Sequence, residues 1–224
     1  MTTLLALDTA TECCSAALLH DGRVTARSEV IPRQHAQRLL PMIEELLGER
    51  ELRLPDVDAL VFGRGPGAFT GVRIATGMVQ GLAFAADKPV IAVSNLAALA
   101  QRAWREHGAE TVAAAIDARM DEVYWGLYCL QDGVMQSLDD ERVCPPEAVS
   151  LPDGVASVAG AGTGWQYADR LAVSAERSWP QMLPNAVDLI TLALPRWLAG
   201  EVLDAADAQP VYLRDKVATP KGQA

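Results

Sequence analysis

A glycine-rich segment at residues 63–73, which reads GRGPGAFTGVR, has the clearest potential for chemistry. An apolar run typical of a buried strand precedes this segment, and a helical pattern follows it. Glycines let a backbone approach a partner closely, and a helix N-terminus presents unpaired N–H groups that suit an anion such as phosphate. The segment is not a P-loop, because no GKS or GKT follows it. It also lacks the GxGxxG spacing, as does the turn at residues 160–164. Phosphate contact and a purely structural tight turn both stay open.

Other reactive residue types form no catalytic or metal-binding motif along the sequence. The histidines are His20, His35 and His107, and the cysteines are Cys13, Cys14, Cys129 and Cys144. HExxH, GxSxG and CxxC patterns are all absent from the sequence, and we expect the cysteines to be reduced core residues. Asp8, Asp117 and Asp121 come near the ends of expected strands. Mg-nucleotide chemistry or ordinary turn and cap roles explain these carboxylates equally well.

The helix expected from Thr70 to about Ala86 contains two interior glycines, Gly77 and Gly81. Each costs about 1 kcal/mol relative to alanine, so some other interaction must offset them. Gly77, Gly81 and Ala85 follow one another at intervals of four residues, which places the three on one face as a flat patch. The patch packs either on the protein's own sheet or on a helix of another chain, and we favour the second interpretation.

Strands precede helices in both halves of the chain, as the period of the apolar residues indicates. Expected strands lie at residues 4–7, 15–19, 23–30, 57–62, 90–93, 111–116, 122–130, 134–138 and 155–159. Expected helices lie at residues 36–47, 70–86, 95–107 and 185–194, and one more follows residues 160–164. Pro41 implies a kinked or later-starting helix, and Pro195 a kink or an end. Thr70 and Asn185 are the expected N-caps.

The repeated order of elements predicts an α/β protein with two lobes that divide near Gly108. The expected domains are residues 1–108, residues 109–200, and a C-terminal segment at residues 201–224 that packs back on the lobes. With 224 residues, half of them apolar, the chain is long enough for a sizeable core.

The net charge of −10 comes from 19 basic and 29 acidic residues. Such a chain is a poor candidate for binding nucleic acid or anionic membranes by itself, because both need a basic surface. The sequence also has no recognisable targeting signal and no apolar run long enough for a membrane span. We therefore expect a cytoplasmic protein.

Six short motifs occur in the order found in one bacterial family. They are LDTAT at residues 7–11, His35 followed by LLPMI at 39–43, GPGAFTGVR at 65–73, QGLA at 80–83, DARMDEVY at 117–124, and PVYLR at 210–214. The chain resembles the TsaB family, also called YeaZ, over nearly its whole length. This resemblance implies a two-lobed actin/Hsp70-like (ASKHA) fold with mixed sheets flanked by helices. It also implies a role beside a TsaD-like paralogue and a TsaE-like ATPase, which modify the adenosine next to the tRNA anticodon.

One departure from the wider family concerns metal binding. TsaD-like paralogues carry an HxxxH metal motif where this chain has Asn95 and Leu99. Asparagine is a poor ligand for transition metals and leucine is none, so we expect no metal, no cofactor and no catalytic residue. Residual contact with ATP or ADP, within the complex, would involve Asp8, Thr9, Gly65, Gly67 and Gly162.

The function that we favour is a non-catalytic scaffold that binds and activates a TsaD-like transferase, with tRNA bound only through the complex. The alternative is an enzyme of the same fold, either a nucleotide hydrolase or a peptidase. The apolar residues of the helix at 36–47 cover more than one stripe, so we expect part of them to be exposed beside the next helix. The expected interface, used by the partner or by a second copy in a homodimer, comprises Leu39, Leu40, Ile43, Leu46, Leu47, Val72, Thr76, Gly77, Met78, Gly81, Phe84 and Ala85.

Overall fold

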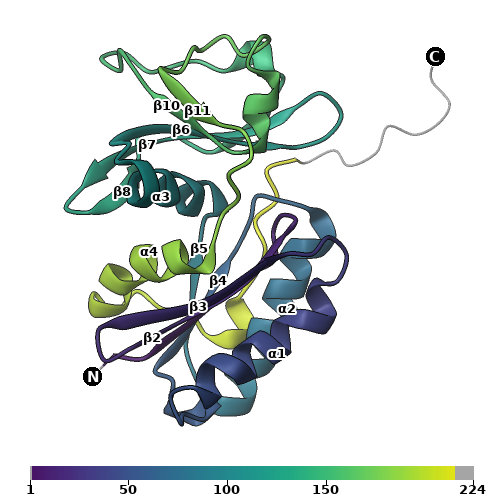
Figure 1. Cartoon of the computed structure of the whole chain (residues 1–224), viewed down its shortest axis with the longest axis vertical. Coiled ribbons are helices and arrows are strands. Elements are labelled where there is room, and N and C mark those ends of the chain that lie inside the picture. The colour runs from purple at the N-terminus through teal and green to yellow at the C-terminus, as the bar shows by residue number, and fades with distance from the viewer. Residues whose placement is uncertain (1, 215–224) are drawn as a thin grey trace, which may run out of the picture.

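The first sheet begins as the antiparallel meander that the sequence predicts (Figure 1). The structure, a computed structural model, describes residues 2–214. The three strands are β1 (Leu4–Asp8), β2 (Cys13–His20) and β3 (Arg23–Val30). Asp21 and Gly22 join β2 to β3 with φ angles of 50° and 72°, the positive values that a two-residue hairpin turn requires.

Two parallel strands complete this sheet in the order β3-β2-β1-β4-β5. They are β4 (Ala59–Gly63) and β5 (Val90–Val93). Helices α1 (His35–Gly48) and α2 (Phe69–Ala86) lie on one face of the sheet, and α2 is the crossover that parallel strands need (Figure 1).

Helix α1 presents a single apolar stripe to the sheet, which corrects the expectation of a second, exposed stripe. The buried residues follow the spacing i, i+3, i+4, i+7 and i+8, and they are Leu39, Met42, Ile43, Leu46 and Leu47. Only Leu40 of the expected set lies off this stripe, with 39% of its surface exposed. The helix begins at His35 and continues through Pro41, so it does not start later.

Helix α2 begins one residue earlier than predicted, and Thr70 lies inside it rather than at its cap. Ala68 holds the N-cap position and makes no side-chain cap. Its backbone is fixed instead, because its N–H donates to the carbonyl of Ala10 over 2.7 Å.

The second sheet has the order β11-β10-β6-β7-β8, and β9 pairs with β7. Its strands are β6 (Thr111–Asp117), β7 (Val123–Gln131), β8 (Val134–Ser137), β9 (Arg142–Cys144), β10 (Ala159–Ala161) and β11 (Arg177–Trp179). The strand predicted at residues 155–159 lies further along the chain, because β10 shares only Ala159 with it, and a 3₁₀ turn at Thr163–Tyr167 follows in place of a longer helix. The indole of Trp165 fixes that turn by donating to the carbonyl of Ala113 and by packing on Gly160.

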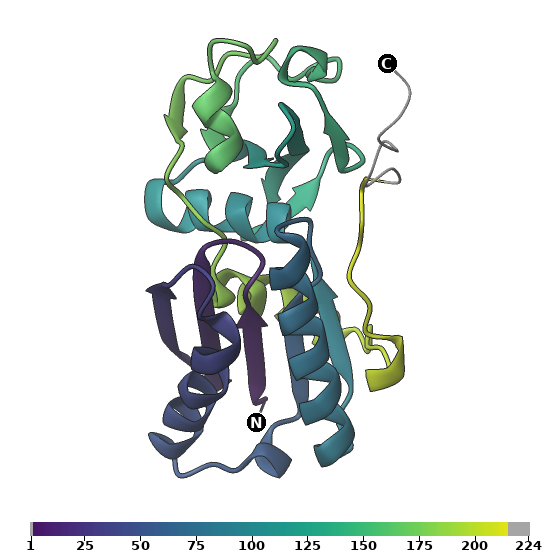
Figure 2. The same cartoon turned by 90° about the vertical axis from the view of Figure 1, so that its right-hand side faces the viewer.

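Helices α3 (Asn95–His107) and α4 (Ala186–Leu198) lie where the two lobes meet (Figures 1 and 2). Ser94 caps α3, and Asn185 caps α4 as predicted. Pro195 lies inside α4 and does not end it. Although its residues fall in the range 109–200, α4 packs against α3 and all five strands of the first sheet.

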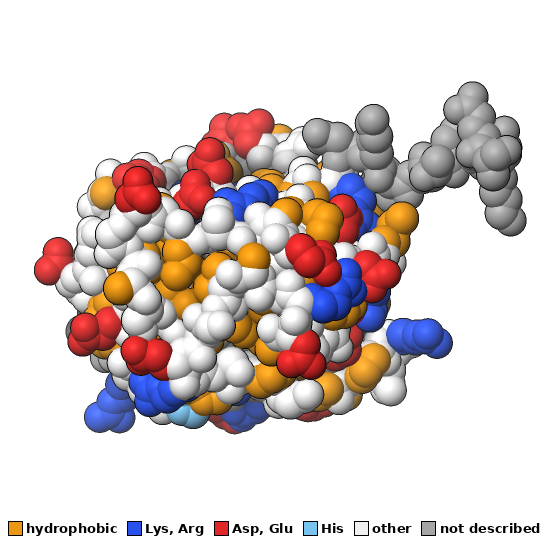
Figure 3. Space-filling model, turned by 90° about the horizontal axis from the view of Figure 1, so that it is seen from above, with side chains coloured by type: hydrophobic (Ala, Val, Ile, Leu, Met, Phe, Trp, Pro, Cys, Tyr) orange, Lys and Arg blue, Asp and Glu red, His pale blue; other side chains and the backbone are white. Residues whose placement is uncertain are grey.

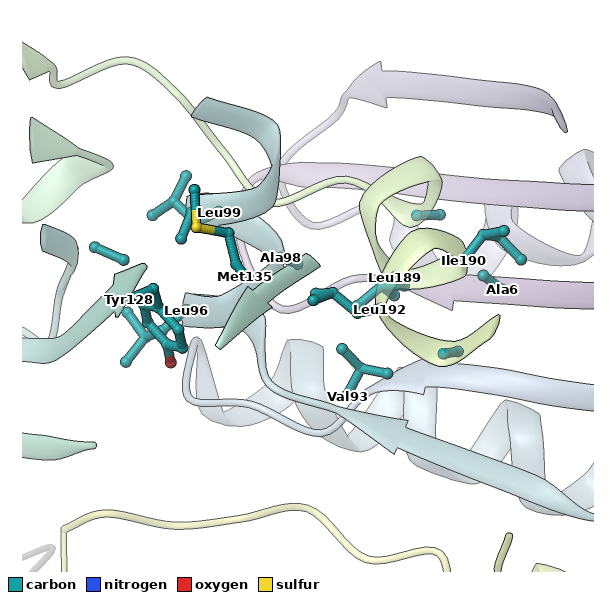
Figure 4. Close-up of a cluster of buried hydrophobic side chains, with 14 of the residues drawn as sticks. Ala6, Val93, Leu96, Ala98, Leu99, Tyr128, Met135, Leu189, Ile190 and Leu192 are labelled. Atoms are coloured by element: carbon teal, nitrogen blue, oxygen red, sulfur yellow. The ribbon is translucent and has the colours of Figure 1, made fainter. Parts of the chain in front are cut away.

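One hydrophobic cluster joins both lobes through these two helices (Figure 4). From the first sheet it includes Ala6, and from the second Tyr128 and Met135. Leu99 of α3 and Leu189 of α4 lie between them, and both are fully buried. The expected two-lobed α/β architecture with mixed sheets is confirmed, and its lobes share a core.

The segment after α4 returns to the first lobe, as expected. Leu203 pairs with Val90 at the free edge of β5, and a 3₁₀ turn at Ala205–Asp207 contacts α2. Residues 215–224 of the predicted C-terminal segment lie outside the described residues. Among the helices formed by residues 2–214, none has the length and apolar character needed to cross a membrane.

Candidate functional site

A cleft of about 780 Å³ separates the lobes on one side of the molecule. Four of the segments that line it are the turn after β1, the start of α2, the loop between β6 and β7, and the C-terminal segment. Thr11, Phe69, Asp117 and Tyr212 are representative of these four. The cleft lies beside the glycine-rich loop, from which Pro66 and Gly67 line it.

Asp8 lies at the end of β1 but does not reach the cleft surface, because it is fully buried. Its Oδ1 accepts hydrogen bonds from Asn95 Nδ2 over 2.6 Å and from the N–H of Ala10 over 3.3 Å. Its Oδ2 has no hydrogen-bond partner among the described residues. Burial raises the pKa of Asp8 to about 6, although the bond from Asn95 lowers that pKa.

Asn95 fixes the glycine-rich loop to Asp8. Besides donating to Asp8, its Oδ1 accepts from the N–H of Gly65 over 2.8 Å, and its own N–H donates to the carbonyl of Gly65 over 3.0 Å. A Cβ on Gly63 would lie 2.4 Å from Asp8 Oδ1, so glycine is required there. The Asn95 amide thus aims a donor at Asp8, which does not suit a cation.

Leu99 lies one turn further along α3 and packs against the second lobe. A Cβ on Gly162 would come within 2.3 Å of a Leu99 methyl group and of the carbonyl oxygen of Ala115. Within residues 2–214, no three His, Cys, Asp or Glu side chains gather as a metal-binding group would require. The absence of a metal from the protein stays a prediction.

The glycine-rich loop packs closely on the turn after β1. A Cβ on Gly67 would lie 2.4 Å from the carbonyl oxygen of Ala10, and one on Gly71 would lie 2.1 Å from that of Thr9. Thr9 closes the contact by donating its hydroxyl to the carbonyl of Gly71 over 2.7 Å. Close packing of two backbone segments therefore accounts for these glycines, which agrees with the interpretation of this segment as a structural tight turn.

The five residues expected to contact a nucleotide are only partly brought together. Asp8, Thr9, Gly65 and Gly67 meet where β1 joins the start of α2, whereas Gly162 belongs to the second lobe. Of these five residues, only Gly67 lines the cleft. Contact with ATP or ADP stays a prediction.

Among the charged and aromatic residues that line the cleft, the sequence suggests a role only for Asp117, which it leaves open between nucleotide chemistry and a turn or cap. Arg73 lies against two rings, with its Cζ 3.3 Å from the centre of Phe69 and 5.0 Å from that of Tyr212. Arg119 pairs with Asp117 over 2.9 Å at the opposite wall. All of these residues belong to the GPGAFTGVR, DARMDEVY and PVYLR motifs. The motifs therefore mark the positions of these residues but do not indicate what the side chains contact.

The glycine face of α2 points to solvent, not to the sheet. A Cβ on Gly77 or Gly81 would meet no atom within 4 Å, and Phe84 beside them is 85% exposed. Val72 and Thr76, by contrast, are buried under the helix.

The expected interface set therefore divides in two. Core residues, which correct the expectation, are Leu39, Ile43, Leu46, Leu47, Val72 and Thr76. Residues with accessible surface are Leu40 of α1 and five residues of α2, which we call the α2 face: Gly77, Met78, Gly81, Phe84 and Ala85.

Comparison with known proteins agrees with this architecture. Residues 26–179 match the family model described as TsaD, tRNA N6-adenosine threonylcarbamoyltransferase. A relative from Escherichia coli K12, named tRNA threonylcarbamoyladenosine biosynthesis protein TsaB, is 44% identical over 97% of each chain. A protein of the same name from Haemophilus influenzae is 43% identical over 98% of this chain and 96% of its own.

The solved structures include one titled YeaZ from Pseudomonas aeruginosa, which is 60% identical to this chain. The two structures superpose with a TM-score of 0.93, and the match covers 95% of this chain and all of that one. The expected actin/Hsp70-like fold is thereby confirmed. The relatives agree with the motifs along the sequence and with the two mixed sheets. The chain therefore belongs to the TsaB (YeaZ) family of tRNA threonylcarbamoyladenosine biosynthesis proteins.

Proposed function

We propose that this chain takes part in tRNA threonylcarbamoyladenosine biosynthesis as a non-catalytic scaffold that binds and activates a TsaD-like transferase. The names of its relatives support the pathway. The observation that carries the scaffold role is the uncovered α2 face, where Gly77 and Gly81 have open space above them and Phe84 is 85% exposed. A TsaE-like ATPase is the further partner in this proposal.

The α2 face has the physical properties of a helix-docking surface. Two interior glycines weaken an exposed helix by about 1 kcal/mol each, and nothing within the described chain uses the space they leave. A helix from another chain gains close backbone approach at that space, with Phe84 as an apolar anchor. Two helices of the TsaD-like partner fit this face, and a second copy of the chain covers it in a homodimer when the partner is absent.

The position of Asp8 supports a role without catalysis. Mg-dependent phosphate chemistry needs a carboxylate that reaches the metal ion, whereas Asp8 is fully buried and already accepts from Asn95. We therefore assign ATP turnover to other subunits, and any nucleotide contact of this chain to the assembled complex.

The charge of the chain supports a tRNA-binding surface that comes mainly from the partner. Basic and acidic side chains are interspersed on the face seen in Figure 3, without a continuous basic area. With a net charge of −10, the chain alone repels a phosphate backbone at physiological salt.

Substitution of Gly81 by leucine tests the docking face. The Cβ of Gly81→Leu meets no atom within 4 Å, so the fold should persist while the leucine keeps a partner helix away. We expect affinity for a purified TsaD-like partner, measured by titration calorimetry, to fall about tenfold or more. Self-association, measured by light scattering, should weaken in parallel.

Gly48→Leu is the matched control, because Gly48 also has open space around it but lies at the far end of α1. Circular dichroism should show both variants folded. A folded Gly81→Leu protein that binds the partner and itself as tightly as the wild type would remove the support for this face. Turnover of ATP or a peptide by the isolated chain would favour the alternative, an enzyme of the same fold.

A further inference from the structure

Residues 208–214, which we call the strap, run from the first lobe to the second along the side of the molecule (Figure 2). The strap starts at Ala208, which is fully buried in the first lobe. Gln80 of α2 donates its side-chain amide to the carbonyl of Ala208 over 2.8 Å. The beginning of the strap is thus fixed to the middle of α2.

The centre of the strap lies on the glycine-rich loop. The N–H of Val211 donates to the carbonyl of Arg64 over 2.8 Å. Gly65 approaches the strap so closely that a Cβ there would lie 3.0 Å from the carbonyl oxygen of Val211. Val211 also lines the cleft, so the strap forms part of the cleft wall.

Tyr212 joins the strap to the first turn of α2. Its ring centre lies 6.0 Å from that of Phe69, and the guanidinium of Arg73 contacts both rings. Phe69 is 57% exposed and Tyr212 is 45% exposed. This three-residue cluster is therefore open to any molecule that contacts the start of α2.

Arg214 ends the strap on the loop between β6 and β7. Its guanidinium pairs with the carboxylate of Glu122 and lies 3.4 Å from the carbonyl oxygen of Arg119. That loop holds Arg119, Met120 and Asp121 at φ angles of 61°, 57° and 57°, which are uncommon for residues other than glycine. Arg214 supplies contacts from outside the loop, to Glu122 and Arg119, that help to hold this conformation.

We propose that the strap is a latch that transmits contact at Phe69 to the β6–β7 loop on the opposite wall of the cleft. When a molecule at the start of α2 moves Phe69, Tyr212 loses its packing partner and Arg214 is no longer held against the loop. The loop then relaxes and the cleft widens. The latch works within the chain and does not depend on which partner the α2 face binds.

Hydrogen exchange of single amides tests this coupling across the cleft. In the β6–β7 loop, the N–H of Ala118 bonds to the carbonyl of Glu122, and the N–H of Glu122 bonds to that of Arg119. Phe69→Ala, a change in the other lobe, should accelerate exchange of these two amides about tenfold, as expected when a charge-assisted contact is lost. Arg214→Ala should accelerate them at least as much.

Three variants separate the latch from a general loosening of the chain. Phe84→Ala removes an equally large exposed ring from α2, outside the cluster of Phe69, Arg73 and Tyr212, and should leave both amides unchanged. Tyr212→Phe keeps the ring and should also leave them unchanged, whereas Tyr212→Ala should mimic Phe69→Ala. Two outcomes overturn the latch: no acceleration in Phe69→Ala, or a second, additive acceleration when Phe69→Ala is combined with Tyr212→Ala.

Discussion

Asp8 is the residue whose surroundings differ most from those of an ordinary aspartate. Its carboxylate is removed from water, Asn95 donates to one oxygen, and the other oxygen has no partner among residues 2–214. A buried charge with half of its hydrogen-bonding capacity unused weakens the fold whenever the group is ionised. The structure therefore makes this position sensitive to pH.

We predict that Asp8 destabilises the protein at neutral pH and that acidification relieves this effect. Burial raises the folded-state pKa from 3.8 to about 6. A raised pKa means that the stabilisation is complete below the unfolded value and disappears as pH rises through the folded value. The free energy of unfolding of Asp8→Asn minus that of the wild type should grow by about 2 kcal/mol from about pH 4 to about pH 8.

Urea unfolding of both proteins across this pH range gives that difference directly. The comparison removes contributions shared by the two proteins, including that of Asp188, whose pKa burial also raises. A difference that stays constant with pH would show that Asp8 is not titrating in this range.

At the scale of the element, α2 has glycines with opposite roles in its first turn and in its interior. Gly71 in the first turn packs on the backbone of Thr9, whereas Gly77 two turns later has open space above it. The same residue type is thus required at one position and a weakness at the other. The sequence pattern alone does not separate these cases.

We predict opposite effects on stability for two alanine substitutions in this helix. Gly71→Ala places a Cβ 2.1 Å from the carbonyl oxygen of Thr9 and should destabilise the protein by about 2 to 3 kcal/mol or more. Gly77→Ala meets no atom within 4 Å and should stabilise it by about 1 kcal/mol through helix propensity. Chemical denaturation monitored by circular dichroism measures both changes, and effects of equal sign would contradict the assignment.

Most elements could be predicted from the sequence because they have one apolar face of regular period. The apolar run of β4 and the Asp21-Gly22 turn are examples, since each is determined by neighbouring residues. Thr70 was wrongly assigned as a cap because Ala68 is held by Ala10, which is distant in sequence. The 3₁₀ turn around Trp165 likewise depends on a hydrogen bond to the second sheet.

The candidate site was less predictable for the same physical reason. The motifs identified loops that line the cleft. Apolar periodicity, however, could not show that Leu39 and Ile43 point inward while Gly77 and Gly81 point outward. The contact of Tyr212 with Phe69 joins residues far apart in the chain. No local pattern encodes such a contact.

At the scale of the whole molecule, α3 and α4 make the two lobes one energetic unit. Their buried side chains form a single cluster with both sheets, including Leu99 of α3 and Leu189 of α4 (Figure 4). Apolar periodicity predicts that each helix has a buried face but does not identify the sheet that covers it. This is why α4 was placed with the second half of the chain.

We predict that the lobes unfold together. Leu189→Ala leaves a cavity in the shared cluster and should cost about 2 to 5 kcal/mol. The midpoint should shift equally in circular dichroism and in tryptophan fluorescence, which reports largely on the second lobe through Trp125 and Trp165. Leu198→Ala, on the same helix but 72% exposed, should change stability by less than about 0.5 kcal/mol. Two separate transitions would show that the lobes are independent.

The return of α4 to the first sheet has a consequence for the order in which the protein can be made. Both faces of the first sheet are buried, one by α1 and α2 and the other by α4. On a ribosome, which releases the N-terminal end first, the second face of this sheet stays uncovered until nearly two hundred residues have been synthesised, because α4 ends at Leu198. The nascent first lobe therefore exposes an apolar surface throughout the synthesis of the second lobe, and a chaperone that shields such surfaces has its longest opportunity there.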